Sequence, residues 1–270
     1  FETRKQTPDC TSACLEPFIQ KQIAAGPMVP PPMIQSSCLN PDGFRLMKWN
    51  TIKGRKKGWA EDFQKFSRNT DILILQEAYL SDDLKKMLDQ EKYQWDMTAA
   101  FEYKEITVGV LTAARTAPVF TCSFRETEPL TRIPKSVLIS RYPLSGADRE
   151  LLVANIHAVN FTMGSAAFQK QIDRLENILA GHQGPIIVSG DFNTWTNSRK
   201  SRINVMAERL ELRAVIFDEN RRSKFLGQFI DHVFYRELEA ISVEIPLATT
   251  SDHNPLIVVF KLANDPDPDI

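Results

Sequence analysis

The sequence predicts an α/β protein in which helices cover layers of β-sheet. Apolar runs of strand length recur from Phe44 onward, and amphipathic segments of helical length lie between some of them. Other runs follow one another after short connections, as the strands of hairpins do. Because helices follow only some of the strands, this order fits sheet layers covered by helices better than a strict succession of βαβ units.

Eight apolar runs are expected to form the strands, several of them buried on both faces. They are F-R-L-M-K-W (44–49), D-I-L-I-L-Q (71–76), T-V-G-V-L-T (107–112), S-V-L-I-S (136–140), L-L-V-A-N-I-H (151–157), P-I-I-V-S-G (185–190), F-I-D-H-V-F-Y (229–235) and N-P-L-I-V-V-F (254–260). The sequence contains no internal repeat of fixed period, so a repeat architecture is not expected.

Four segments with helical periodicity lie among these runs, at residues 58–68, 81–92, 165–180 and 198–210. The third has apolar residues at helical spacing with charges on the opposite face; they are Phe168, Ile172, Leu175 and Leu179. The fourth begins next to Thr196, Asn197 and Ser198, residue types that cap helix N-termini.

The chain divides into an arm, one domain and a tail. Residues 1–43 contain seven prolines and are expected to form an extended arm on the domain surface. Residues 44–261 form the domain, and residues 262–270 form an acidic tail that we expect to be disordered. Cys10, Cys14 and Cys38 fall in the arm, where either a disulfide or reduced thiols would fit. Cys122 lies alone in a strand-like run and is expected to be a buried thiol.

Composition limits the partners that the protein can have. The formal net charge of 270 residues is −1, so any anionic partner must be held by local basic groups. No apolar run approaches the roughly 20 residues of a membrane-spanning helix, and we expect no stable membrane insertion. The chain begins at Phe1 rather than Met, which together with the arm cysteines favours a periplasmic or secreted protein and leaves a cytoplasmic one open. We expect a monomer.

Residues with chemically useful side chains fall at or beside the ends of the expected strands. They are Asn50, Glu77, Asn155, His157, Asp191, Asn193, Asp252 and His253, with Asp231 inside an apolar strand. Each of the first eight has an ordinary structural explanation, such as a turn residue or a helix cap. Asp231 is harder to explain, because a buried carboxylate is costly unless it is paired. Together they predict one polar cluster at a sheet edge.

The motifs W-N, Q-E, N-I-H, G-D-F-N, D-H-V-F and S-D-H-N-P, in this order, resemble those of the endonuclease/exonuclease/phosphatase (DNase I-like) superfamily. The similarity runs from about Phe44 to Phe260. The segments E-T-E-P-L-T-R-I-P-K-S-V-L-I, N-I-H-A-V-N-F and S-D-H-N-P-L-I-V are most similar to an uncharacterised bacterial YafD-like branch. The resemblance implies a four-layer α/β/β/α sandwich, with two mostly antiparallel sheets packed face to face and helices outside.

The residues and the resemblance together suggest a site for Mg²⁺, which Mn²⁺ could replace. Glu77 is the expected metal carboxylate, with Asn50 beside it and Asp252 as a further contact. We expect His253 to be the general base and Asp231 to accept its other N–H; Asp191 is the alternative base. Asn193 would orient the water or the phosphate, and His157 would donate to a phosphoryl oxygen or the leaving group.

Substrate contacts are expected from Asn50, from Asn155, which would also support its loop, and from Arg115. Many relatives carry G-x-A, two hydrophobic residues, then S-[RK]-x-P near the phosphate. Here G-V-L-T-A-A-R-T-A-P keeps Arg115 but has Ala114 in place of Ser, which puts the phosphate contact of that loop in doubt. Three basic groups, at residues 53–57, 198–202 and 221–224, could form the rim of the pocket or ordinary charged surface.

The expected activity is Mg²⁺-dependent hydrolysis of a phosphodiester, with DNA as the preferred substrate because of these basic groups. One alternative is a phosphatase or a phospholipase C-type enzyme acting on a phosphorylated lipid or sugar, which the near-zero net charge favours. A second alternative is a catalytically silent binding module. Such a module would be expected to lack Glu77, Asp191 or His253, and the chain has all three.

Overall fold

The computed structural model describes residues 38–162 and 164–263. They form two six-stranded sheets and four α-helices. The first sheet has the order β13 (Leu238–Glu244), β14 (Leu256–Leu262), β1 (Phe44–Asn50), β2 (Ile72–Tyr79), β4 (Ile106–Ala114) and β3 (Gln94–Tyr103). The second has the order β5 (Phe120–Thr127), β6 (Pro134–Pro143), β7 (Glu150–His157), β8 (Ile186–Asp191), β12 (Asp231–Arg236) and β9 (Arg213–Ala214).

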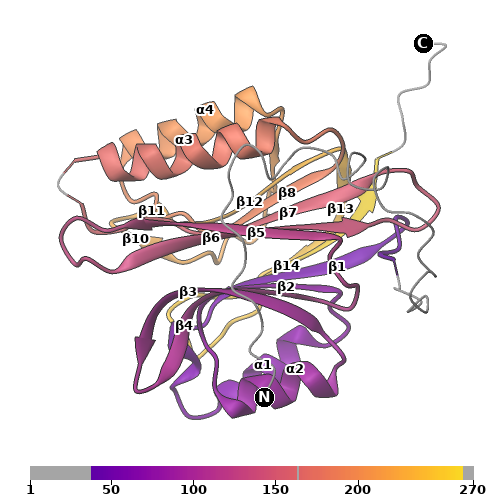
Figure 1. The fold of residues 1–270 in the computed structure, drawn as a ribbon, viewed down its shortest axis with the longest axis horizontal. Helices are drawn as coiled ribbons and strands as arrows, with labels where there is room; N and C mark the ends of the chain where they lie inside the picture. Colours follow the sequence, from indigo (N-terminus) through magenta and orange to yellow (C-terminus); the bar gives the residue numbers. More distant parts are fainter. Residues whose placement is uncertain (1–37, 163, 264–270) are drawn as a thin grey trace, which may run out of the picture.

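The two sheets pack face to face and the helices lie outside them, so the predicted four-layer α/β/β/α sandwich is confirmed (Figure 1). The helices α1 (Trp59–Ser67) and α2 (Asp82–Gln90) cover the first sheet, and α3 (Ala166–Ala180) and α4 (Asn197–Arg209) cover the second. A short 3-10 helix, Ile52–Gly54, follows β1, and the hairpin of β10 (Lys224–Phe225) and β11 (Gln228–Phe229) precedes β12.

Each interface between layers has its own apolar core. Met47 and Leu73 of the first sheet pack with Phe63 and Leu88 of the outer helices. A second cluster, which includes Leu46, Ile74, Val153, Ile187 and Val258, fills the space between the sheets. Phe168, Ile172, Leu175 and Leu179 of α3 pack on the second sheet, as their spacing predicts.

All four predicted helices and all eight predicted strands are present. The Oγ1 atom of Thr196 accepts a hydrogen bond from the backbone N–H of Arg199 at 3.3 Å, so Thr196 is the cap of α4. Among the strands without a prediction are β3 and β13, which form the two edges of the first sheet. An edge strand can be short of apolar residues, and this explains the weak pattern of β13, L-E-A-I-S-V-E.

The arm and tail predictions fall mainly outside the described residues. Within the described part of the arm, Leu39 is buried in the core between the sheets and pairs with Leu144 in an isolated bridge. At the other end, β14 continues to Leu262, one residue past the predicted boundary. Cys122 is buried, as expected, but it is disulfide-bonded rather than a thiol. None of the described helices is long and apolar enough to cross a membrane.

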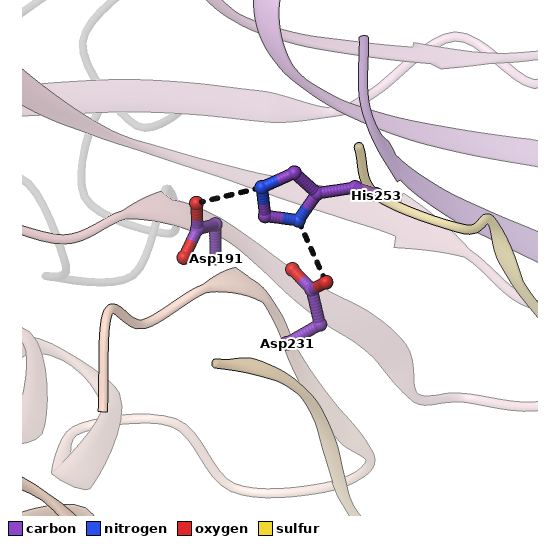
Figure 2. A group of neighbouring side chains, drawn as sticks. All are labelled: Asp191, Asp231 and His253. Atoms are coloured by element: carbon purple, nitrogen blue, oxygen red, sulfur yellow. Dashed lines mark hydrogen bonds and ion pairs between the residues drawn. The ribbon is translucent and has the colours of Figure 1, made fainter. Parts of the chain in front are cut away.

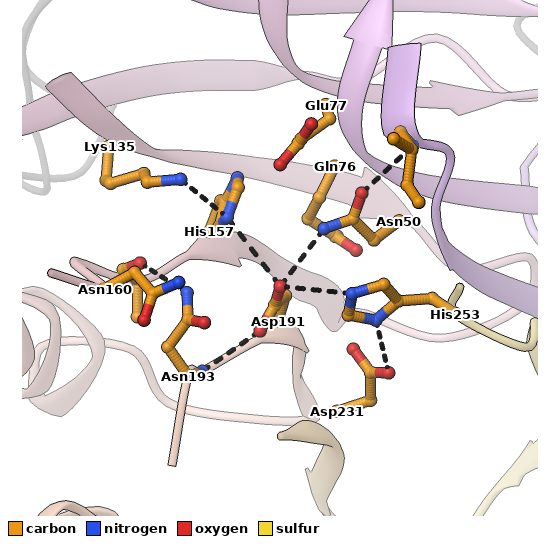
Figure 3. Close-up of polar contacts among 12 residues, drawn as sticks. Asn50, Gln76, Glu77, Lys135, His157, Asn160, Asp191, Asn193, Asp231 and His253 are labelled. Carbon is orange, nitrogen blue, oxygen red and sulfur yellow. Dashed lines mark hydrogen bonds and ion pairs between the residues drawn. The ribbon is translucent and has the colours of Figure 1, made fainter. Parts of the chain in front are cut away.

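The sheets contain two pairs of parallel neighbours, and these pairs position the site. β1 runs parallel to β2 and β7 runs parallel to β8, whereas the other neighbouring strands are antiparallel. Asn50 is therefore level with Gln76 at the end of one pair, and His157 is level with Asp191 at the end of the other. Both pairs end at the same edge of the sandwich, where their polar side chains meet (Figure 3).

Candidate active site

Asp191, the last residue of β8, is the centre of the polar cluster (Figure 3). Its Oδ2 atom accepts a hydrogen bond from Nδ2 of Asn50 at 3.1 Å. The same oxygen lies 3.7 Å from Nε2 of His157 and 3.8 Å from Nε2 of His253. One amide and two imidazoles thus face one carboxylate, from three segments that are far apart in the sequence. The predicted convergence of these residues is present in the structure.

Asp231 and His253 form a buried pair behind this carboxylate (Figure 2). Oδ2 of Asp231 lies 2.8 Å from Nδ1 of His253, so the other ring nitrogen, Nε2, faces Asp191. Oδ1 of Asp231 pairs with the ammonium of Lys48, and both side chains are fully buried. Asp231 therefore holds the imidazole, as predicted, and its own charge is balanced by a lysine from β1.

Burial and neighbouring charged groups determine the pKa values of Asp231 and His253. Burial alone would raise the pKa of Asp231, but His253 and Lys48 outweigh it and hold the pKa well below its usual range. Burial alone would lower the pKa of His253, but Asp231 and then Asp191 raise it to about 9. Without a bound metal, His253 is therefore protonated at neutral pH and its Nε2–H can donate a hydrogen bond.

His157 differs from His253 in its charge. Its Nε2 atom lies 2.9 Å from Nζ of Lys135, a residue at the start of β6. Burial and the positive charge of Lys135 lower the pKa of His157 well below its usual value. A neutral imidazole can accept the hydrogen bond from the ammonium, which orients Lys135 toward the site. The site therefore contains a charged His253 and a neutral His157.

Glu77 reaches the site through an irregularity of β2. The register with β4 shifts between Leu75 and Ala78, and Glu77 has a left-handed backbone with φ of 48°. Such a bulge redirects a side chain, and strained backbone of this kind is found at functional sites. The Glu77 carboxylate is a quarter exposed and pairs with Lys53 at 3.0 Å. The residue before it, Gln76, points the other way and is fully buried.

The residues present fit a hard divalent cation. The carboxylate of Glu77 and the amide oxygen of Asn50 are ligands of the kind that Mg²⁺ prefers. Lys53 is itself partly exposed, so it can move away from Glu77 when a cation binds. A further group that could hold a metal consists of Asp191, Asp231 and His253, whose ligand atoms lie within 4.8 Å of one another. Since Asp231 is paired with Lys48, Asp191 is the carboxylate of this group that can face a cation.

Asn193 reaches the site through a turn. Its backbone has φ of 50°, so the chain does not continue in extended form beyond β8. The turn allows the backbone N–H of Asn193 to donate to Oδ1 of Asp191 at 3.0 Å. Its Nδ2 donates to the carbonyl of Ala158 at 2.9 Å. Phe192 is fully buried in the core.

Two predicted substrate contacts are not at the site. Arg115 follows β4, which is antiparallel to β2, so it lies at the opposite edge of the sheet and bonds to Thr70 and Glu91. Asn155 is fully buried between the sheets, where its amide bonds to the first sheet. Asp252 is close: its Oδ1 lies 3.6 Å from Nε2 of His253, and its side chain is mostly exposed. Its role as a metal contact stays a prediction.

Lys48, Lys135 and Glu128 were not predicted as site residues, and Arg199 was expected only as part of a basic group at the rim. A lysine within the apolar run F-R-L-M-K-W was the available signal for Lys48. Lys135 and Glu128 belong to the segment E-T-E-P-L-T-R-I-P-K that resembles the YafD-like branch. Arg199 is buried and donates to the carbonyls of Val159, Asn193 and Asn160, so it ties together two loops of the site.

The three basic groups do not contribute equally to a rim. Lys53 of the first group reaches Glu77, and Arg55, Lys56 and Lys57 are exposed. In the second group, Arg199 is buried and Arg202 is paired with Asp173 and Glu176 on α3. In the third, Arg222 packs over Phe229 and donates to the carbonyl of Asp231. Lys200, Arg221 and Lys224 are also exposed, so each group keeps at least one cation at the surface, and the first group keeps the most.

Comparison with known proteins agrees with these motifs. Residues 49–253 match the Endonuclease/Exonuclease/phosphatase family, a span that runs from Trp49 to His253 and so includes the polar cluster. The chain belongs to this family. Members of the family are phosphoesterases, including nucleases and phosphatases.

Bacterial relatives cover most of the chain. A UPF0294 protein of Vibrio cholerae is 38% identical over 232 residues, which are 85% of this chain and 82% of the relative. A UPF0294 protein of Yersinia pestis is 37% identical over 218 residues, which are 81% of this chain and 84% of the relative. These are the YafD-like proteins, so the predicted branch of the family is confirmed as well.

Solved structures share the fold at low sequence identity. The human Nocturnin catalytic domain with bound sulfate anion is similar with a TM-score of 0.65 and 21% identity, over 87% of this chain and 100% of the other. ANGEL2, a 2′,3′-cyclic phosphatase, has a TM-score of 0.60 and 15% identity, over 81% of this chain and 95% of the other. At this level of identity the likeness supports the fold alone.

Proposed function

We propose that the protein is a Mg²⁺-dependent phosphodiesterase that acts on nucleic acid, with DNA as the preferred polymer and Mn²⁺ as a possible replacement ion. The observation that carries this proposal is the environment of Asp191, where an amide and two imidazoles face one carboxylate within 3.8 Å. Hydrolysis of a phosphodiester requires a group that takes a proton from water and several donors for the phosphoryl oxygens. Asp191 offers the first, and the amide of Asn50, the Nε2–H of His253 and the ammonium of Lys135 offer the second.

In this proposal the ion is held by Glu77 and Asn50, with Asp252 as a further contact. A bound divalent ion would neutralise negative charge on the phosphoryl oxygens. Asn50 also donates to Asp191, so the same side chain would align the metal site with the catalytic carboxylate. Lys135 adds a positive charge on the other side of His157, where it would offset charge on the phosphate.

We favour Asp191 as the general base, although His253 was the first choice from the sequence. A base must accept a proton, and the pKa of about 9 gives His253 a proton at neutral pH. His253 is better suited to donate Nε2–H to a phosphoryl oxygen, with Asp231 fixing its orientation through Nδ1. Asn193 keeps the proposed role of orienting the water or the phosphate near Asp191.

The experiment uses bis-p-nitrophenyl phosphate, plasmid DNA, linear single-stranded DNA, p-nitrophenyl phosphate and a phosphocholine diester, each with Mg²⁺, Mn²⁺ or EDTA. We expect hydrolysis of the diesters and of DNA, and its loss in EDTA. Asp191→Asn should lower kcat by at least 100-fold, because it removes the base, with little change in thermal stability. Activity that persists in EDTA, or a fully active Asp191→Asn protein, would overturn the proposal.

A phosphatase or phospholipase C-type activity is the second candidate. The net charge is −1, and Arg199, Arg202 and Arg222 are engaged within the protein, which leaves fewer cations for a long polyanion and favours a smaller phosphorylated substrate. Turnover of p-nitrophenyl phosphate or the phosphocholine diester without hydrolysis of DNA would select this candidate. A folded, metal-binding protein without turnover would indicate a binding module instead.

We also propose that the protein is exported and monomeric. The disulfide at Cys122 supports export, because disulfides persist in oxidising compartments and are rare in the bacterial cytosol. Cell fractionation with an antibody against the chain would test the location, and light scattering of the purified protein would test the oligomeric state.

A further inference from the structure

A pocket lies directly beside the polar cluster. It has a volume of about 130 Å³, and Glu77, His157 and Lys135 form part of its wall. The rest of the wall is mainly apolar and includes Phe101, Val108, Val110, Ile133 and Phe161. A group attached to a phosphate held at the polar cluster could therefore enter a hydrophobic space without leaving the site.

The strands of the first sheet are shaped to leave this space open. β3 bulges against β4 between Ala99 and Phe101, and Ala100 lines the pocket. Opposite the bulge is Gly109, where an added Cβ atom would lie only 2.0 Å from the carbonyl oxygen of Thr98. The close approach of β3 and β4 therefore requires glycine here. Bulges are common next to functional sites, where they change the direction of a strand or of its side chains.

Glu128 holds two segments of the wall in place. This carboxylate is buried, and its Oε1 accepts from the backbone N–H of Asn160 at 2.7 Å, next to Phe161. Its Oε2 accepts from Oγ1 of Thr131 at 2.6 Å, in the loop that carries Ile133. One buried acid thus fixes both sides of the pocket mouth, which indicates a preformed binding site.

The pocket also contains a polar atom that nothing satisfies. Ser136 lines it, is 1% exposed, and has an Oγ atom without a hydrogen-bond partner among the described residues. A buried polar group without a partner costs free energy, and it calls for an explanation in terms of a ligand or water. The Oγ atom has almost no accessible surface, so it would meet a ligand only after its side chain rotates. A ring with hydrogen-bonding atoms on its edge could then accept its hydrogen bond, whereas an acyl chain could not.

We propose that this pocket binds one unpaired nucleobase of the substrate. The inference rests on the proposed phosphodiesterase function and narrows its substrate. A cavity of about 150 Å³ is known to accept benzene in another protein, so about 130 Å³ suits the ring of one base that projects partly outward. Phe101 and Phe161 can contact the face of such a ring, since bases stack on aromatic side chains regardless of sequence.

This assignment predicts a preference for single-stranded substrates. A base in a duplex would have to leave its stack to enter the pocket, which is unfavourable. This step is less unfavourable at a single-stranded or frayed end. The exposed cations Arg55, Lys56 and Lys57 follow the 3-10 helix that carries Lys53, and they could meet the adjoining phosphates.

Binding tests the pocket without any need for turnover. In calorimetric titrations of the full chain with Mg²⁺, we expect thymidine 5′-monophosphate to bind roughly tenfold more tightly than 2-deoxyribose 5-phosphate, because only the former has a base that can stack. Ser136→Ala and Ala100→Leu should each reduce the ratio of the two affinities. Ala100→Leu does so by filling the pocket. Neither variant changes a residue of the polar cluster, so binding of the sugar phosphate should be unchanged.

Ser140→Ala is the matched control, because Ser140 is a buried serine on the same strand, β6, outside the pocket wall. It should keep the full ratio. Equal affinity for the two phosphates, or a ratio unaffected by Ala100→Leu, would overturn the assignment. Thermal unfolding checks that the variants fold, and Ser136→Ala should lose no stability because its hydroxyl has no partner to lose.

Turnover separates this inference from the proposed function. With labelled 20-mers we expect single-stranded DNA to be cleaved faster than the matching duplex. We expect Ser136→Ala to lower the rate on DNA but not the rate on a phosphodiester that carries no ring. Preference for the duplex would overturn the inference while leaving the phosphodiesterase intact. If no diester is hydrolysed, the proposed function fails, and the titrations alone decide whether the pocket binds a base.

Discussion

The ionisation of the His253 imidazole depends strongly on its surroundings. Its pKa is about 9 in the folded protein, against 6.5 for an unperturbed histidine. The folded state therefore binds the proton more tightly than the unfolded state does. This linkage stabilises the fold fully below pH 6.5, and the stabilisation is lost as the pH rises through about 9.

We therefore expect His253→Gln to differ from the wild type in the pH dependence of its stability. In EDTA, the difference in unfolding free energy between the two proteins should shrink by on the order of 2–3 kcal/mol between pH 6 and pH 10. Urea denaturation at several pH values measures it. His182→Gln is the control, because burial lowers the pKa of His182 and its contribution is instead lost as the pH falls. Parallel curves for the wild type and His253→Gln would contradict the pairing with Asp231.

At the level of elements, β8 brings Asp191 to the site by packing closely against β7. Gly190 is level with Ile156 in the parallel pairing of the two strands. A Cβ atom at Gly190 would lie 1.9 Å from the carbonyl oxygen of Ile156, so the backbone would have to move. The glycine of G-D-F-N thus permits a close approach of the two backbones.

Gly190→Ala should therefore destabilise the protein by about 2–3 kcal/mol, the cost of overpacking at a rigid position. It should also lower kcat/KM, because the shift of β8 would move Asp191 relative to Asn50. Gly43→Ala is the control, since an added Cβ there meets nothing within 4 Å. Thermal unfolding and diester hydrolysis measure the two effects. Equal stability of the two variants would mean that β7 and β8 can move apart at little cost.

The elements differ in how clearly the sequence predicts them. The strands β2, β7 and β8 lie inside their sheets and have continuous apolar runs, so their residues specify them directly. The edge strands β3 and β13 bury less surface and have no such pattern. The bulge at Glu77 has no local signal either, because it depends on the register between β2 and β4.

For the whole molecule, the site could be predicted in part because polar residues at strand ends were recognised as one set. What the sequence did not specify is the direction of each strand. Arg115 ends β4 just as Glu77 lies near the end of β2, but the two strands are antiparallel and the residues lie at opposite edges. Lys48 was missed for a related reason, because its partner, Asp231, is 183 positions away and on the other sheet.

Asn155 links the two sheets of the sandwich rather than the protein and its substrate. From β7 it accepts a hydrogen bond from Nε2 of Gln76 at 2.7 Å, and it donates to the carbonyls of Leu75 and Leu111 and to Oγ1 of Thr112. All of these partners lie on the first sheet, and Asn155 is fully buried. Removing the amide would leave several buried polar groups without a partner, each at a cost of about 1–3 kcal/mol.

Asn155→Leu should therefore lower the unfolding free energy by about 3–5 kcal/mol, since more than one group loses its partner. A second substitution, Gln76→Leu, should recover part of this loss, because it removes one of the polar groups left unpaired. Urea denaturation of the two single variants and the double variant gives the coupling free energy between Asn155 and Gln76, which lie on different sheets. The KM for bis-p-nitrophenyl phosphate should stay near the wild-type value wherever Asn155→Leu is folded. A raised KM with unchanged stability would instead restore Asn155 as a substrate contact.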